Sequence, residues 1–135
     1  MTVRSFCLAM STCLLLAGAD REPKTLQVKE ARRLVYESLS EETKRLPGVG
    51  LDPGRVENGR CMTFDVLWAN PGIGSAHVAF YTVDLRTGAL WTGVTGVLKL
   101  VSIPAVTRLQ RDLRKSVGIS ETEYRKAVEK HPCGY

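Results

Sequence analysis

The sequence predicts an α+β domain made of an N-terminal helix, an antiparallel meander of three to four strands and two C-terminal helices. Near both ends of the chain, apolar residues recur at spacings of three and four, which is typical of helices that bury one face. Between them, residues 61–69 alternate apolar and polar side chains, as a half-buried strand does. Residues 84–88 (DLRTG) supply the Asp and Gly of a tight turn between strands. We therefore expect helices to cover one face of an antiparallel sheet.

The first helix is expected to begin after Thr25, which can cap it. Its apolar stripe consists of Val28, Ala31, Leu34, Val35 and Leu39. Ser40 is a second cap and predicts a short helical turn as far as Leu46, which Pro47 and Gly48 would end.

The segment that follows, residues 47–59, is rich in Gly and Pro and is predicted to be a loop. It holds too few apolar side chains to fold alone, so we expect it to be either mobile or held by contacts from elsewhere. Because binding often resides in loops on a rigid scaffold, Val49 and Leu51 are candidate contact residues.

Three strands are predicted next. They are residues 61–69, residues 76–85, which are rich in β-branched and aromatic side chains, and residues 89–92, with turns at 70–75 and 84–88. The third strand can continue to Val101 with a break or bulge at Gly93 or Gly96, and a fourth strand would then follow Gly96.

The C-terminal region returns to a helical pattern. Ser102 is expected to cap a helix that has Pro104 in its first turn and ends at Gly118. Its apolar stripe is Val106, Leu109, Leu113 and Val117. Ser120 and Glu123 match the capping box of a last helix, which has a thin apolar edge of Tyr124, Ala127 and Val128.

Residues 1–19 have the three parts of a cleavable secretory signal. Arg4 supplies the positive charge, residues 6–19 form an uncharged apolar run, and Ala17 and Ala19 are the small residues at its end. The run is short for a membrane span, which takes about 20 apolar residues. We expect cleavage after Ala19 and one exported domain over residues 20–135, periplasmic or extracellular. The alternative is an uncleaved signal, through which the protein would be anchored to a membrane.

The cysteines fit an oxidising compartment. Cys7 and Cys13 would leave with the signal, so that Cys61 and Cys133 remain. We expect them to form a disulfide that ties the C-terminal tail to the first strand, stabilising the domain by roughly 4 kcal/mol on the chain-entropy model. The alternatives are an intermolecular bridge and a metal pair with His131, but further ligands at a suitable spacing are lacking. We therefore expect no metal and no cofactor.

The first helix and the hairpin motif Tyr81-x-Val83-Asp84-x-x-Thr87-Gly88-x-x-Trp91 also resemble a known family. Over about residues 26–92 the chain is similar to the PepSY-type modules of exported bacterial proteins. The resemblance implies an exported binding or regulatory module, for example one that restrains a peptidase. It carries over no catalytic residue.

Candidates for catalysis are few, because the chain has two histidines. His77 with Asp65 or Asp84 is the pair that a small hydrolase would use. Each residue also has a simpler explanation: His77 starts a strand, Asp65 faces solvent and Asp84 begins a turn. We therefore predict no catalytic residue.

Two other features are candidates for binding. Trp68 and Trp91 lie on strands, where Trp is more often part of the core but can anchor a partner. Arg108 and Arg111 belong to a basic helix face, which Asp112 interrupts. Since no aromatic residue is interleaved for base stacking, we expect no nucleic acid partner.

Taken together, these features favour an exported, non-enzymatic binding module, inhibitor-like or immunity-like, that acts on a protein in the exported compartment. Its candidate contact residues are Trp68, Trp91, Val49, Leu51, Arg108 and Arg111. One alternative is the secreted hydrolase that uses His77, and the other is a membrane-anchored structural protein of the cell envelope.

Overall fold

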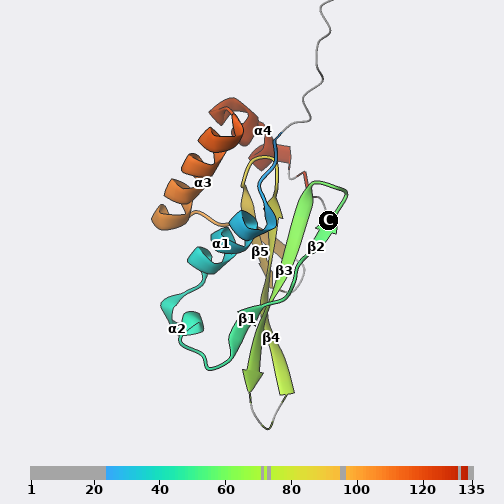
Figure 1. Cartoon of the computed structure of the whole chain (residues 1–135), viewed down its shortest axis with the longest axis vertical. Coiled ribbons are helices and arrows are strands. Elements are labelled where there is room, and N and C mark those ends of the chain that lie inside the picture. Colours follow the sequence, from blue (N-terminus) through green and yellow to red (C-terminus); the bar gives the residue numbers. More distant parts are fainter. Residues whose placement is uncertain (1–23, 71, 73, 95–96, 131, 134–135) are drawn as a thin grey trace, which may run out of the picture.

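The computed structural model describes residues 24–70, 72, 74–94, 97–130 and 132–133 of the 135-residue chain. Several predicted features lie outside the described residues: the signal at residues 1–19, His131, Gly96 and part of the turn at 70–75. The elements follow in the order α1 (Val28–Ser38), α2 (Glu41–Lys44), β1 (Val49–Leu51), β2 (Arg55–Glu57), β3 (Cys61–Asn70), β4 (Gly74–Asp84), β5 (Leu90–Val94), β6 (Val97–Leu100), α3 (Pro104–Val117) and α4 (Glu121–Lys130) (Figure 1).

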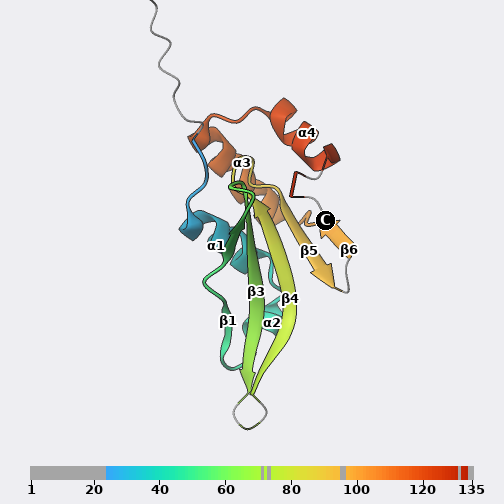
Figure 2. The ribbon, with the colours of Figure 1, turned by 90° about the vertical axis from the view of Figure 1, so that its right-hand side faces the viewer.

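The strands form one antiparallel sheet in the order β1–β3–β4–β5–β6, and β2 pairs with the first residues of β3. The predicted meander is confirmed in β3, β4 and β5, and β6 is the fourth strand expected after Gly96. The turn at Asp84 is confirmed as well, with Gly88 in the left-handed conformation at φ +72°. The end of β3 and the start of β4 pair with each other and extend beyond the helices as a long hairpin (Figures 1 and 2).

The prediction of a loop over residues 47–59 is wrong. Here β1 and β2 pair in succession along β3, with Val49 opposite Trp68 and Val56 opposite Met62. Each strand has three residues, too few for a period-two pattern to appear in the sequence. Between them Gly54 has φ +87°, and a Cβ there would come within 2.7 Å of the Met62 and Phe64 side chains.

The main core lies between one face of the sheet and helices α1 and α3. Its fully buried side chains include Leu34 and Val35 of α1, Phe64 of β3 and Val106 of α3. The predicted stripes are mostly confirmed, but Val28 is 47% exposed because α1 begins at that residue.

The helix starts differ from the predictions. Gln27 precedes α1 and forms a capping box with Glu30, so Thr25 is not the cap. Ile103 precedes α3, since Pro104 takes the first helical position, and Ser102 is therefore not a cap either. The predicted caps at Ser40 and Ser120 and the stop at Gly118 are confirmed.

A second, smaller core lies on the opposite face of the sheet at one end, so the prediction of helices on one face is wrong. Cys61, Ala89, Trp91 and Cys133 are buried there, and Tyr124 and Val128 of α4 pack against them. Adjacent residues of a strand point to opposite faces, which places Leu90 in the main core and Trp91 in the second. Figure 2 shows α4 at the same end of the molecule as β5.

The disulfide between Cys61 and Cys133 is confirmed, with their Cα atoms 5.6 Å apart. It uses both sulfurs, which rules out the metal pair that Cys133 would form with His131. Among the described residues, no helix is long and apolar enough to span a membrane.

Candidate functional site

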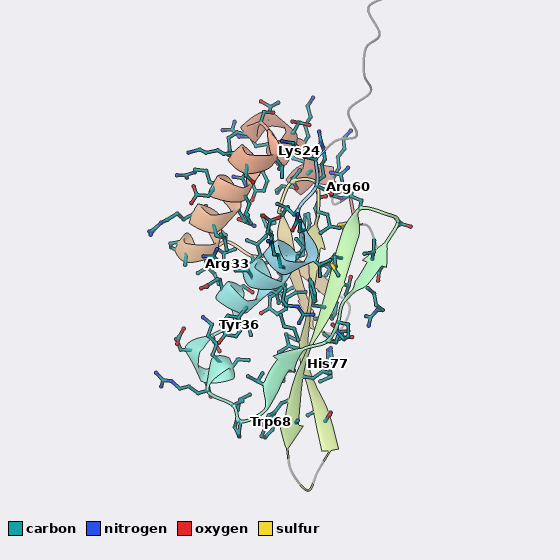
Figure 3. The ribbon with its side chains drawn as sticks, viewed as in Figure 1. Lys24, Arg33, Tyr36, Arg60, Trp68 and His77 are labelled. Carbon is teal, nitrogen blue, oxygen red and sulfur yellow. A yellow bond between two sulfur atoms is a disulfide. The ribbon has the colours of Figure 1, made fainter. Side chains whose placement is uncertain are left out.

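A polar cluster occupies the face of β3 and β4 opposite α1. Asp65 points to this face because its neighbours Phe64 and Val66 lie in the main core. His77 Nε2 is 3.1 Å from Asp65 Oδ1, and Arg55 Nη1 donates a hydrogen bond of 2.9 Å to Asp65 Oδ2. Figure 3 shows His77 on the sheet, away from the helices.

The cluster favours the charged form of Asp65. Burial, the largest single influence, raises the pKa of this carboxyl, but the hydrogen bonds and charges of Arg55 and His77 together outweigh it and lower the pKa. The backbone of Asp65 also has a structural role, because its N–H donates a hydrogen bond to Asp52 Oδ1. The cluster therefore fixes the corner between β1 and β2 against the sheet.

A hydrolase would need His77 and a carboxylate within hydrogen-bond distance, and both in one concave pocket. The structure meets the first requirement but not the second. His77 and Asp65 are within hydrogen-bond distance, but His77 is 52% exposed and lines neither of the two hollows described below. Within the described chain, no hydroxyl or thiol is hydrogen-bonded to His77 as a nucleophile would be.

The pairing of His77 with Asp84 is wrong. His77 lies opposite Leu67 near the free end of the sheet, whereas Asp84 lies opposite Cys61 at the other end. Asp84 is fully buried and accepts two hydrogen bonds from Arg60, one from the Arg86 backbone and one from the Thr87 hydroxyl. All of its oxygens are thus engaged by the turn.

The two tryptophans lie in different surroundings. Trp91 is 3% exposed in the second core, so it packs there and presents no anchor at the surface. Trp68 is half-buried at the far end of β3 beside Val49, and its Nε1 is buried without a hydrogen-bond acceptor (Figure 3). Of the two, Trp68 is the one placed to contact a partner.

Val49 and Leu51 are partly buried and pack against the main core from β1. Arg32 of α1 donates hydrogen bonds to the carbonyls of Leu51 and Asp52, at 3.2 and 2.6 Å. These contacts hold the segment in place, which is one of the two outcomes that the sequence predicts. Their role in binding stays a prediction.

Two hollows in the described part of the chain are lined mainly by basic and hydroxyl side chains. The first, of about 240 Å³, lies between the Asp84 turn and α4 and contains Arg60, Arg86, Lys126 and Lys130 together with Glu123. The second, of about 400 Å³, is lined by Ser102, Pro104, Thr107, Arg108 and Arg111. The sequence predicted both arginines, but the two hydroxyls beside them carry no signal that sets them apart from other surface residues.

No group of three or more His, Cys, Asp or Glu side chains among the described residues is arranged to hold a metal ion. The site residues offer hydrogen bonding and charge, from the Asp65 cluster, Trp68 and the arginines of the second hollow.

Comparison with known proteins identifies a similar fold. No protein-family model matches the chain, and no curated protein matches its sequence. A solved structure does match: a chain in the structure of a type VI secretion system effector–immunity complex from Pseudomonas protegens. The TM-score is 0.60 at 19% identity, and the match covers 82% of this chain and 92% of that chain. The two chains therefore share a fold.

Proposed function

We propose that this protein is an exported binding module that acts on a protein partner, as immunity proteins and inhibitors do. The observation that carries the proposal is the shared fold with a chain of an effector–immunity complex. Either member of such a complex binds a protein, and the match covers 82% of this chain and 92% of that chain.

Three features support the exported location and the binding role. The predicted signal at residues 1–19 and the disulfide both fit an oxidising compartment. The resemblance to PepSY-type modules, which implies restraint of a partner, points to the same class of function.

The test begins with recovery of the partner. The tagged full chain is expressed in cells that make it naturally, cross-linked in the exported fraction and purified, and the captured protein is identified by mass spectrometry. The two proteins are then purified separately and mixed. We expect a stable complex of defined stoichiometry in size-exclusion chromatography with light scattering, and inhibition of the partner's own activity. Purified components that stay separate would refute the proposal.

The hydrogen bond between His77 and Asp65 favours one second candidate, the small hydrolase. It predicts turnover of p-nitrophenyl ester or peptide substrates by the purified chain, lost in His77→Ala and Asp65→Asn. Turnover that survives both substitutions would be a contaminant, and absence of turnover leaves the binding function as the better explanation.

A further inference from the structure

The second hollow is a ready-made site for anions. Its lining combines the guanidinium groups of Arg108 and Arg111 with the hydroxyls of Ser102 and Thr107, and no carboxylate contributes to it. All four side chains can donate hydrogen bonds, and the guanidinium groups suit carboxylate oxygens in particular.

The two arginines have no partner in the described part of the chain. Arg108 and Arg111 form neither an ion pair nor a hydrogen bond there, although Asp112 stands one turn after Arg108. Two like charges three residues apart on a helix repel each other slightly. An anion between them would remove that repulsion.

The first hollow provides a contrast. There Arg60 is bound to the buried carboxylate of Asp84 and Arg86 to Glu123, so part of the positive charge is neutralised within the protein. The second hollow has fewer basic side chains than the first, but none of the described residues that line it is a carboxylate. Lys126 and Lys130 of the first hollow make no ion pair with the described residues either, but Glu123 lies beside them, whereas no carboxylate in the lining offsets Arg108 and Arg111.

An open sheet edge leads to the second hollow. In the described chain β6 pairs with β5 alone, and Ser102 follows the end of β6 by two residues. Three apolar side chains along this stretch are exposed: Val97 at 62%, Leu100 at 39% and Ile103 at 40%. An exposed edge of this kind can accept an extended segment of another protein through main-chain hydrogen bonds.

We infer that the second hollow and the edge of β6 together receive an extended acidic segment of a protein partner. This inference rests on the proposed function and adds the chemistry of the partner. Its carboxylates would face Arg108 and Arg111 on the α3 side, and its apolar side chains would face Leu100, which shares the opposite face of β6 with Leu98. A membrane surface fits less well. Val97 and Leu100 lie on β6 and Ile103 precedes α3, whereas a helix that lies on lipid carries its apolar residues on its own exposed face.

The test uses the full chain and a fluorescein-labelled peptide of alternating glutamate and valine, with binding followed by fluorescence anisotropy. The test variant is Arg108→Glu with Arg111→Glu. The control is Lys126→Glu with Lys130→Glu, which changes the net charge equally at the first hollow. All four residues are exposed, so circular dichroism should show folded proteins.

We expect the arginine variant to lose about tenfold or more in affinity and the lysine variant to stay within about twofold of the natural sequence. Hydrogen exchange should show that the peptide protects the backbone of residues 97–100. Equal losses in both variants, no measurable binding by the natural sequence, or no protection of β6 would overturn the inference. So would arginine-dependent binding to phosphatidylglycerol vesicles without binding to the peptide, because the ligand would then be lipid.

The partner complex separates this inference from the proposed function. If the captured partner binds the arginine variant with unchanged affinity, the site is wrong while the binding function stands. If no partner is captured but the peptide result holds, the acidic-segment site stands and the immunity-like function fails.

Discussion

Two aspartates on the sheet are held in opposite surroundings. Asp84 is fully buried and ion-paired with Arg60, whose side chain remains 42% exposed. Asp65 lies on the open face, and its side chain is 24% exposed beside Arg55 and His77. The first aspartate shapes a turn inside the fold, and the second connects the corner between β1 and β2 to the sheet.

Asp84→Ala should destabilise the protein by about 1–3 kcal/mol, because it leaves the buried Thr87 hydroxyl without its acceptor, whereas the partly exposed Arg60 guanidinium can be hydrated. Urea denaturation measures the change in the free energy of unfolding. Asp112→Ala is the control, since Asp112 is exposed and makes no ion pair with the described residues. A loss at Asp84 no larger than at Asp112 would contradict the assigned role.

Asp65 should make stability depend on acid pH. Because its pKa is lower in the folded protein than the ordinary value of 3.8, the unfolded chain binds the proton more readily. Its contribution to stability is therefore complete above about pH 4 and is lost as the pH falls through the lower, folded pKa. Between pH 5 and pH 2, Asp65→Asn should lose less stability than the natural sequence in urea titrations. Parallel curves for the two proteins would be evidence against this.

Helix α1 holds the edge of the sheet as well as the core. Arg32 reaches across to the carbonyls of Leu51 and Asp52 at the end of β1, and its guanidinium lies 5.3 Å from the centre of the Phe64 ring. The neighbouring Arg33 is exposed and makes no such contact with the described residues (Figure 3). One arginine of α1 is thus structural and the next is free.

Arg32→Ala should therefore destabilise the protein by about 1.5–3 kcal/mol, the usual range for hydrogen bonds made by a charged group. Arg33→Ala should stay within about 0.5 kcal/mol of the natural sequence. Chemical denaturation gives both values, and hydrogen exchange should show faster exchange in residues 49–57 for the Arg32 variant. Equal effects of the two substitutions would mean that the link between α1 and β1 is not needed.

These elements also show what a sequence can predict here. The pattern at residues 61–92 was sufficient for β3, β4 and β5, because each strand is long enough to alternate and Gly88 marks the turn. In contrast, β1 and β2 depend on β3 and on Arg32, contacts between segments far apart in the chain. The role of Gln110 could not be predicted either, because its side chain donates a hydrogen bond of 2.8 Å to the carbonyl of Gly88, which is far away in the sequence.

The candidate site residues, too, could be predicted only in part from the sequence. Arg108, Arg111 and Trp68 stood out by residue type, and the structure places all three where a partner could reach them. Trp91 stood out equally, yet it is buried, because only the position of α4 decides which face of β5 is covered. Residue type identified candidates, and tertiary packing separated those at the surface from those in the core.

The molecule as a whole is built from two cores on opposite faces of one sheet. The larger core joins α1 and α3 to the strands, and the smaller one joins α4 and the disulfide to β5. Between the two C-terminal helices, Arg114 donates to Glu121 and stacks on Tyr124 at 3.9 Å from the ring centre. The smaller core has few buried residues, so the disulfide should carry much of its stability.

Replacing the disulfide cysteines Cys61 and Cys133 with alanine tests this division. On the chain-entropy model the bridge contributes roughly 4 kcal/mol, which corresponds to a fall in Tm of about 15 °C or more for a domain of this size. The smaller core should loosen first, because the disulfide is its link to β3, whereas α1 and α3 keep their own contacts with the sheet. When the cysteine substitutions are combined with Trp68→Phe, Trp91 is the one remaining tryptophan. Its fluorescence emission should shift to the red at temperatures below the main unfolding transition. A variant without Cys61 and Cys133 that keeps the Tm and the Trp91 emission of the disulfide form would show that α4 is held without the bridge.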